Sequence, residues 1–226
     1  MKVNLFILFI TIFSVNAVEL PFYEAKYKFE SDEINITGIR KFNKNSKGYV
    51  IEFQASNLIV GMNFSSLFHF EDYKVIPKSY DVKIKPKFLN RDQFIEFDYE
   101  ENQIISKGSN EWFKILNQDV LIMDPLNVQI MIRTLIKENK TEFSLNIVDM
   151  QKGDYKEYDF EVIGSEMCVF NEEKINCIVL QRSREGSDRK VTYFLMEKYE
   201  YMFLKIIDIN PERKNTLNLE EILSFG

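Results

Sequence analysis

One stretch of the chain, residues 120–137, constrains the fold most, because it alone combines a helix-start signal with helical spacing. Asp124 can accept hydrogen bonds from the free N–H groups of a first helical turn, and Pro125 suits the first helical position, where no N–H is needed. After this start, apolar residues recur at the i, i+3, i+4 and i+7 spacing of one helix face. We therefore expect a helix with an apolar face that packs in the core or against an apolar ligand, made of Val128, Met131, Ile132 and Leu135.

The same stretch also has a strand-like pattern. Leu126, Val128, Ile130 and Ile132 alternate with polar residues, as in a half-exposed strand. The Asp-Pro start and the length of the stretch favour the helix. Leu126 and Ile130 then lie off the apolar face, so the helix should be buried on two sides, as when it plugs a curved sheet. Its polar residues line the opposite side: Gln129, Arg133 and Lys137.

The rest of the chain reads as about a dozen short strands separated by turns. Residues 23–31 alternate strictly between apolar and charged side chains, which is typical of a half-exposed antiparallel strand. In residues 34–42 the apolar phase slips at Gly38, which predicts a β-bulge. Pro77 cannot donate to a ladder and therefore predicts a sheet edge or the start of a strand. The expected fold is mainly β: an antiparallel curved sheet or open barrel packed on one principal helix.

The N-terminal residues 1–17 have the features of a secretory signal peptide. Lys2 is followed by an apolar run of residues 5–13, too short to span a membrane, and a small residue stands at the expected cleavage position, Ala17. We expect a single β-rich domain, residues 18–226, exported to the periplasm in soluble form. Without Lys2 the chain carries 28 basic and 35 acidic residues, a net charge of −7 with no basic block. This charge argues against nucleic acid as a partner.

Cys168 and Cys177 flank a short polar turn. If Glu172 and Glu173 form a two-residue hairpin turn, the two cysteines lie directly opposite each other in a non-hydrogen-bonded pair. An oxidising compartment favours a disulfide between them. A pair of free thiols is the alternative, because Glu-Glu suits a tight hairpin turn poorly and another loop length would shift the register.

With these elements in place, the sequence resembles the exported bacterial family known as domain of unknown function three-one-zero-eight. The resemblance implies an exported antiparallel sheet that wraps towards one helix, and it supplies no catalytic residues. It covers nearly the whole mature chain and rests on short motifs: LPFYEAKY at residues 20–27, FDY at 97–99, DPLNVQ at 124–129, YDFEV at 158–162 and the strands of residues 182–206.

No catalytic or metal-binding constellation stands out. The sequence lacks a Gly-x-Ser-x-Gly elbow, a glycine-rich phosphate loop and metal-ligand spacing. His69, the only histidine, would be a general base or metal ligand in a functional interpretation, but a half-buried strand histidine is the simpler expectation. We expect no enzyme activity and no cofactor.

Two functional hypotheses follow from different classes. The first is a periplasmic protein that binds or carries an apolar ligand, such as a lipid or acyl chain, in the concave face of the sheet. The second is an envelope interaction or assembly protein with no small ligand, which predicts a filled interior and an exposed sheet edge near Pro77.

Overall fold

The computed structural model describes residues 20–32, 34–58, 60–86, 88, 91–117 and 119–226. The predicted signal peptide and its cleavage position at Ala17 lie outside this range. The described elements are fifteen strands, one α-helix and a short 3₁₀ helix, η2. In chain order they are β1 (Tyr23–Glu30), β2 (Asn35–Asn45), β3 (Gly48–Ser56), β4 (Gly61–Glu71), β5 (Lys74–Lys85), β6 (Gln93–Asp98), β7 (Gln103–Gly108), β8 (Trp112–Ile115), β9 (Ile122–Met123), α1 (Asn127–Lys137), β10 (Glu142–Val148), β11 (Tyr155–Phe170), β12 (Glu173–Ser183), β13 (Lys190–Met196), η2 (Glu197–Tyr199), β14 (Met202–Asn210) and β15 (Arg213–Phe225).

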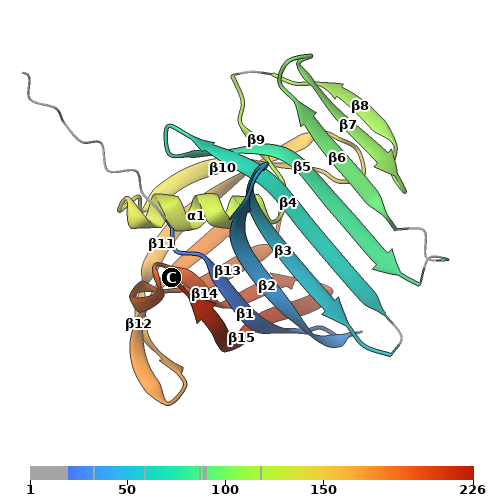
Figure 1. The fold of residues 1–226 in the computed structure, drawn as a ribbon. Helices are drawn as coiled ribbons and strands as arrows, with labels where there is room; N and C mark the ends of the chain where they lie inside the picture. Colours follow the sequence, from blue (N-terminus) through green and yellow to red (C-terminus); the bar gives the residue numbers. More distant parts are fainter. Residues whose placement is uncertain (1–19, 33, 59, 87, 89–90, 118) are drawn as a thin grey trace, which may run out of the picture.

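All fifteen strands belong to one sheet that curves around α1 (Figure 1). The order is β8-β7-β6-β5-β4-β3-β2-β1-β15-β14-β13-β12-β11-β10-β9, so neighbours in sequence pair except β8 and β9, which form the two ends, and the two halves of the chain join where β1 pairs with β15. The strands pair antiparallel except β9, which runs parallel to β10. The predicted class, a mainly antiparallel curved sheet on one principal helix, is confirmed.

Alternation of side chains places the core on the concave face of the sheet. In β1, Tyr23, Ala25 and Tyr27 are buried, as the strict alternation predicts. Across the neighbouring strands, the ring of Phe42 stacks on those of Tyr49 and Phe68. Aromatic side chains thus fill much of the space between the strands and α1.

The expected bulge at Gly38 is wrong. Both ladders of β2 run past Gly38 without a register shift. The slip in the apolar pattern has another cause: two inward positions of β2, Gly38 and Arg40, are not apolar but are buried between Ile36 and Phe42. At Gly38 a Cβ atom would lie 2.7 Å from the Cβ of Ala55, so glycine is needed here for close packing against β3.

The start of α1 follows the predicted signal. Asp124 Oδ1 accepts hydrogen bonds from the N–H groups of Leu126 and Asn127 at 2.8 and 2.9 Å, and the Asp124 carbonyl accepts one from Val128 at 3.2 Å. Asp124 therefore performs the capping role, although the regular helix begins only at Asn127. Its side chain is also fixed to the sheet, because Ser66 Oγ donates to Asp124 Oδ2 at 2.6 Å.

The helix is buried on more than its apolar face. Leu126 and Ile130, which lie off that face, are buried as expected for a helix that plugs a curved sheet. The assignment of Arg133 to a polar outer side is wrong, because its side chain is fully buried. Its Nε and Nη2 atoms donate to the carbonyl of Glu200, and this contact ties the middle of the helix to the β13–β14 connection.

Among the described residues, side-chain hydrogen bonds and not backbone pairing connect the β8 end of the sheet to its β9 end. Trp112 Nε1 in β8 donates to the carbonyl of Met150, in the turn between β10 and β11, at 3.1 Å. Gln93 Nε2 donates to the same carbonyl at 2.6 Å. The Trp112 ring packs so closely on Gly153, which has a φ of +76°, that a Cβ there would lie 2.4 Å from the ring. The sheet is therefore an open barrel whose seam is covered by these contacts.

Candidate ligand-binding site

A cavity of about 290 Å³ opens between the N-terminal end of α1 and strands β10 to β14. From the helix it is lined by Pro125, Val128 and Gln129. Cavities that bind small molecules start at roughly this volume. We call this cavity the mouth of the barrel; its lining from the sheet consists of Ile147, Val148, Tyr158, Arg182, Arg189, Val191, Tyr193, Ile206 and Asp208.

The charge of the mouth is positive. Arg189 forms a bidentate pair with Asp208, so these two charges offset each other. Arg182 lies over the ring of Tyr158, with its guanidinium carbon 4.6 Å from the ring centroid. Among the described residues no carboxylate forms an ion pair with Arg182. One cation in the lining is therefore left without an anionic partner.

A second cation lies directly behind the lining. Arg40, at an inward position of β2, is only 3% exposed, and its Nη1 donates to Gln129 Oε1 at 2.6 Å. The guanidinium of Arg40 also lies 5.0 Å from the centre of the Tyr27 ring. Gln129 thus separates a buried guanidinium from the mouth. A neutral amide oxygen satisfies one donor of Arg40 but does not offset its charge.

The two buried arginines are not fully paired. Arg40 Nε and Arg133 Nη1 have no hydrogen-bond partner among the described residues. Burying a cation is costly unless it is paired and hydrogen-bonded, and burial accordingly lowers the pKa of Arg133. Both arginines lie against tyrosine rings, Arg40 on Tyr27 and Arg133 on Tyr23, and such contacts offset part of this cost. The interior beside α1 therefore carries positive charge.

Asp124 is the fully buried carboxyl group at the start of the helix. Burial raises its pKa to about 7, although the hydrogen bonds that it accepts act in the opposite direction. Its oxygens are occupied by Ser66, Leu126 and Asn127. The carboxyl group of Asp124 is thus committed to the helix start.

The apolar helix face predicted as core or ligand contact is mostly core. Ile132 is fully buried, Met131 is buried and Leu135 packs against the core with partial exposure. Of the four residues only Val128 lines the mouth. The sequence pattern predicted the helix face, but the charge of the mouth comes from two arginines on other elements, in β2 and β12. Arg40 and Arg182 lie at inward strand positions, which a hydrophobic pattern does not detect.

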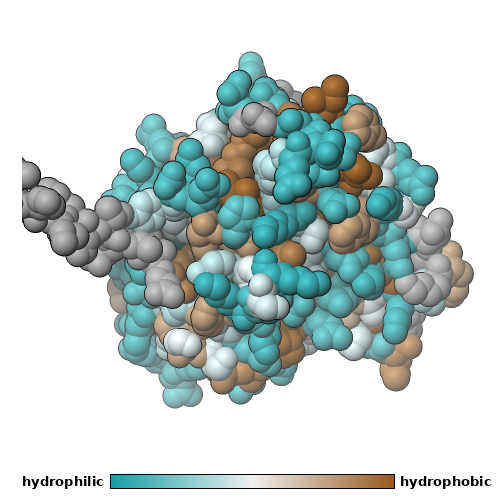
Figure 2. Space-filling view, turned by 45° about the horizontal axis from the view of Figure 1, so that its top comes forward, coloured by the Kyte–Doolittle hydropathy of each residue, from teal (hydrophilic) through white to brown (hydrophobic). Residues whose placement is uncertain are grey.

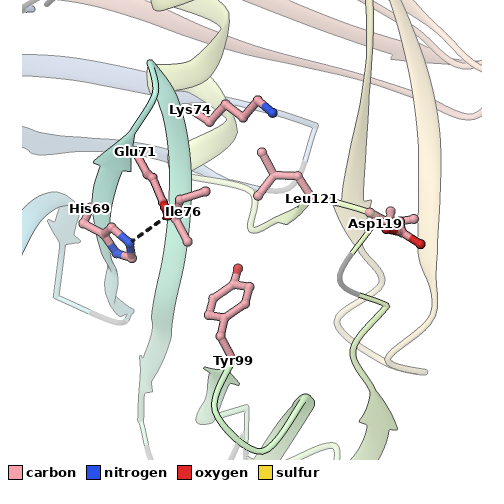
Figure 3. A pocket seen from close by; sticks show the side chains of 8 residues that line it. His69, Glu71, Lys74, Ile76, Tyr99, Asp119 and Leu121 are labelled. Carbon is pink, nitrogen blue, oxygen red and sulfur yellow. Dashed lines mark ion pairs between the residues drawn. The ribbon is translucent and has the colours of Figure 1, made fainter.

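His69 lies near the end of β4 with a half-exposed side chain, as expected for a strand histidine. It lines a second cavity of about 380 Å³, together with Tyr99 and Leu121 (Figure 3). Over the described ranges, no group of three or more His, Cys, Asp or Glu side chains could hold a metal ion. The metal-ligand interpretation of His69 therefore has no support in the described residues.

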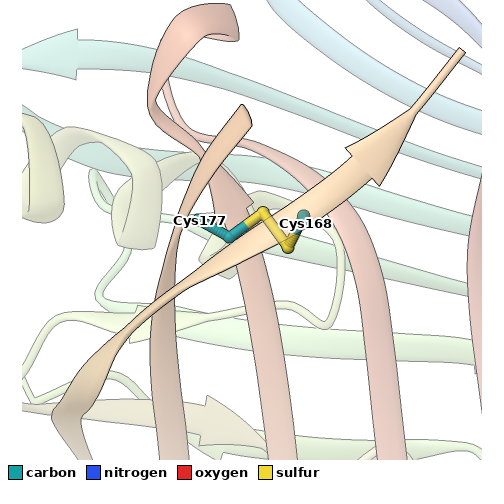
Figure 4. The surroundings of a disulfide bond; sticks show 2 residues. All are labelled: Cys168 and Cys177. Carbon is teal, nitrogen blue, oxygen red and sulfur yellow. A yellow bond between two sulfur atoms is a disulfide. The ribbon is translucent and has the colours of Figure 1, made fainter. Parts of the chain in front are cut away.

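Cys168 and Cys177 form a disulfide within the β11–β12 hairpin, with Cα atoms 6.0 Å apart (Figure 4). The predicted register is wrong. The turn is Asn171-Glu172, both with positive φ, so Cys168 pairs with Ile175 and the disulfide joins diagonal neighbours. Asn adopts a left-handed conformation more readily than Glu, which moves the turn one residue earlier than expected.

Hydrophobic side chains are dispersed over the visible surface of the protein. On the face in Figure 2, hydrophobic side chains are scattered between hydrophilic ones and do not form one continuous patch. Within the described ranges, no helix has the length and apolar character needed to cross a membrane.

No family model matches the sequence, and no curated protein matches it either. Among solved structures, the fold is similar to a crystal structure titled as a beta-barrel-like protein of domain of unknown function DUF1849 from Brucella abortus. The TM-score is 0.61 at 11% sequence identity, over 91% of this chain and 98% of the other. At this identity the likeness concerns the fold alone. It supports a barrel-like fold found in an uncharacterised domain family, but not the particular family that the sequence resembles, domain of unknown function three-one-zero-eight.

Proposed function

We propose that this protein is an exported, non-catalytic binding protein that takes one small amphipathic anion, such as a fatty acid, into the mouth of the barrel. The observation that carries the proposal is the unpaired charge of Arg182 in a cavity whose other lining residues are apolar or aromatic, apart from Gln129 and the mutually paired Arg189 and Asp208. A carboxylate would pair with Arg182, and a short chain would contact Val128, Val191 and Ile206. The volume of about 290 Å³ suits one chain better than a two-chain lipid.

Arg40 supports the same choice of ligand. Its buried charge lies behind Gln129 and adds to the positive potential of the mouth. The net charge of the chain is −6, so an anion would be drawn to this local positive region and not to the surface as a whole. A neutral apolar ligand would leave Arg182 without a partner and is therefore disfavoured.

The proposed compartment is the periplasm. The apolar run after Lys2 and the small residue Ala17 favour export, and the disulfide between Cys168 and Cys177 is of a kind that persists in oxidising compartments. Protein recovered from the periplasm should begin at Val18. An N-terminus at Met1, or protein retained in the cytoplasm, would contradict this proposal.

A calorimetric titration with decanoate tests the proposed ligand class, with decanol as the uncharged probe of the same chain length. Wild-type protein should bind decanoate more tightly than decanol. Arg182→Gln should weaken decanoate binding at least tenfold, because it removes the cation that pairs with the carboxylate. The matched control is Arg213→Gln, which removes an exposed arginine at the start of β15 and should leave the affinity unchanged.

Gln129→Glu tests the contribution of Arg40 in the same titration. A carboxylate at position 129 would offset the charge of Arg40 internally and repel an anion from the mouth. Decanoate binding should fall at least tenfold, while decanol binding should change little. Wild-type protein that fails to bind decanoate, or variants that bind it as tightly as wild type, would overturn the proposal.

The alternative is an envelope interaction protein that works through a sheet edge, and one observation favours it. β5 is an inner strand of the sheet and Pro77 is buried, so the expected exposed edge at Pro77 is wrong, but β5 pairs with β6 only over Ser79–Val82 and has no β6 partner around Pro77. This second function gains weight if the titration finds no anion binding in wild-type protein.

A further inference from the structure

The second cavity lies on a different part of the molecule from the mouth. It is formed by the ends of β4 and β5, the β6–β7 turn and the segment that leads into β9. In Figure 3, the hydroxyl of Tyr99 points into the space between Ile76 and Leu121, and His69 lies beside Ile76 on the neighbouring strand. The cavity measures about 380 Å³, within the range of small-molecule sites.

Two residues that line this cavity each carry a buried polar atom without a partner. His69 Nδ1 and Tyr99 Oη form no hydrogen bond with any described residue. Buried polar atoms in proteins are almost always hydrogen-bonded, and leaving one unpaired costs free energy. Only four buried side-chain atoms in the described residues lack partners, and two of them belong to residues that line this one cavity.

The two atoms have complementary roles. Burial and the nearby charge of Lys78 lower the pKa of His69, so the imidazole is neutral at physiological pH and has one acceptor nitrogen. Its Nε2 faces Glu71 at 3.9 Å, which leaves Nδ1 as the acceptor. Burial raises the pKa of Tyr99 to about 12, so its hydroxyl stays protonated and can donate. An acceptor and a donor in one cavity match a ligand hydroxyl group, which can bond to both kinds of atom.

The remaining lining excludes a strong anion. Glu71 and Asp119 carry negative charge against the single positive charge of Lys74. The floor is apolar, formed by Ile76, Val120 and Leu121. We propose that this cavity binds a small neutral ligand that bears hydroxyl groups on an apolar ring face, which is the chemistry of a monosaccharide. The site is independent of the mouth and of the ligand proposed there.

Saturation-transfer NMR with methyl β-glucoside tests the proposal on the disulfide-bonded mature protein. Tetrahydropyran, which has the same ring without hydroxyl groups, is the matched probe. Wild-type protein should give saturation transfer to the glucoside and little to tetrahydropyran. Binding should also shift the Nδ1 resonance of His69, because that nitrogen gains a hydrogen-bond donor.

Tyr99→Phe removes only the unpaired hydroxyl and should weaken glucoside binding at least fivefold. The control is Tyr155→Phe, which removes a hydroxyl from an exposed residue at the start of β11 and should leave binding unchanged. The unfolding midpoint of ligand-free Tyr99→Phe should equal or exceed that of wild type, since no protein contact is lost. Absence of glucoside binding at millimolar concentration, equal binding by Tyr99→Phe, or a lowered midpoint in that variant would each overturn the proposal.

Discussion

At the scale of single residues, the interior of this protein contains buried arginines at positions where the pattern of apolar residues is interrupted. Arg40 occupies an inward position of β2, and Arg133 lies on the side of α1 that looked polar and exposed. Each is held by neutral oxygen atoms and tyrosine rings, not by a carboxylate. Sequence patterns identify apolar faces well, but they cannot tell a solvated arginine from one buried against aromatic rings. For this reason the helix could be predicted and its buried charges could not.

Asp124 gives a testable consequence at this scale. Burial raises its pKa from the ordinary value of 3.8 to about 7, so between these values the folded protein holds a proton that the unfolded chain releases. The free energy of unfolding should therefore fall as pH rises from about 4 to about 7, by about 4 kcal/mol from this group. Asp124→Asn should lack this component. Urea unfolding of both proteins at pH 5 and pH 7.5 covers about 2.5 kcal/mol of this change, and His69 contributes equally to both.

An equal pH dependence in wild type and Asp124→Asn would contradict this account of Asp124. The asparagine variant is an appropriate comparison, because its side-chain oxygen can still accept the N–H groups of Leu126 and Asn127.

At the scale of elements, the existence and start of α1 followed from Asp124 and Pro125, whereas its surroundings did not. A helix with one apolar face should tolerate truncation of Ile130 better than truncation of Ile132. Both residues are fully buried, so the two truncations should be about equally costly. Comparing them therefore cannot show whether this stretch is a helix or a strand. The β11–β12 turn illustrates the same limit: the two cysteines could be brought together from sequence, but the turn position depends on the left-handed conformation of Asn171.

The structure predicts unequal effects along the apolar helix face. Ile132→Ala should lower the free energy of unfolding by about 2–5 kcal/mol, because it leaves a cavity in the core. Leu135→Ala should cost less, because Leu135 is partly exposed. Denaturant unfolding monitored by circular dichroism measures both values. A loss at Leu135 equal to or larger than the loss at Ile132 would show that the helix is rotated from its described position.

At the scale of the whole molecule, the sequence of alternating strands predicted a curved antiparallel sheet, and the single helix predicted what the sheet wraps around. The closing contacts could not be predicted, because Trp112, Met150 and Gly153 come together only through the curvature of the complete sheet. The mouth is likewise formed only by the curvature of the complete sheet. Its lining joins the start of α1 to strands that lie from 18 to more than 80 residues further along the chain. Sites assembled in this way leave no local motif in a sequence.

The central claim is that the mouth between α1 and strands β10 to β14 binds an amphipathic anion. The most direct test is an isotope-filtered NOE experiment on methyl-labelled protein with unlabelled decanoate. The account predicts cross-peaks between the methylene protons of decanoate and the methyl groups of Val128, Val191 and Ile206, and their loss in Arg182→Gln. Cross-peaks confined to methyl groups outside the mouth, or none at saturating decanoate, would contradict it.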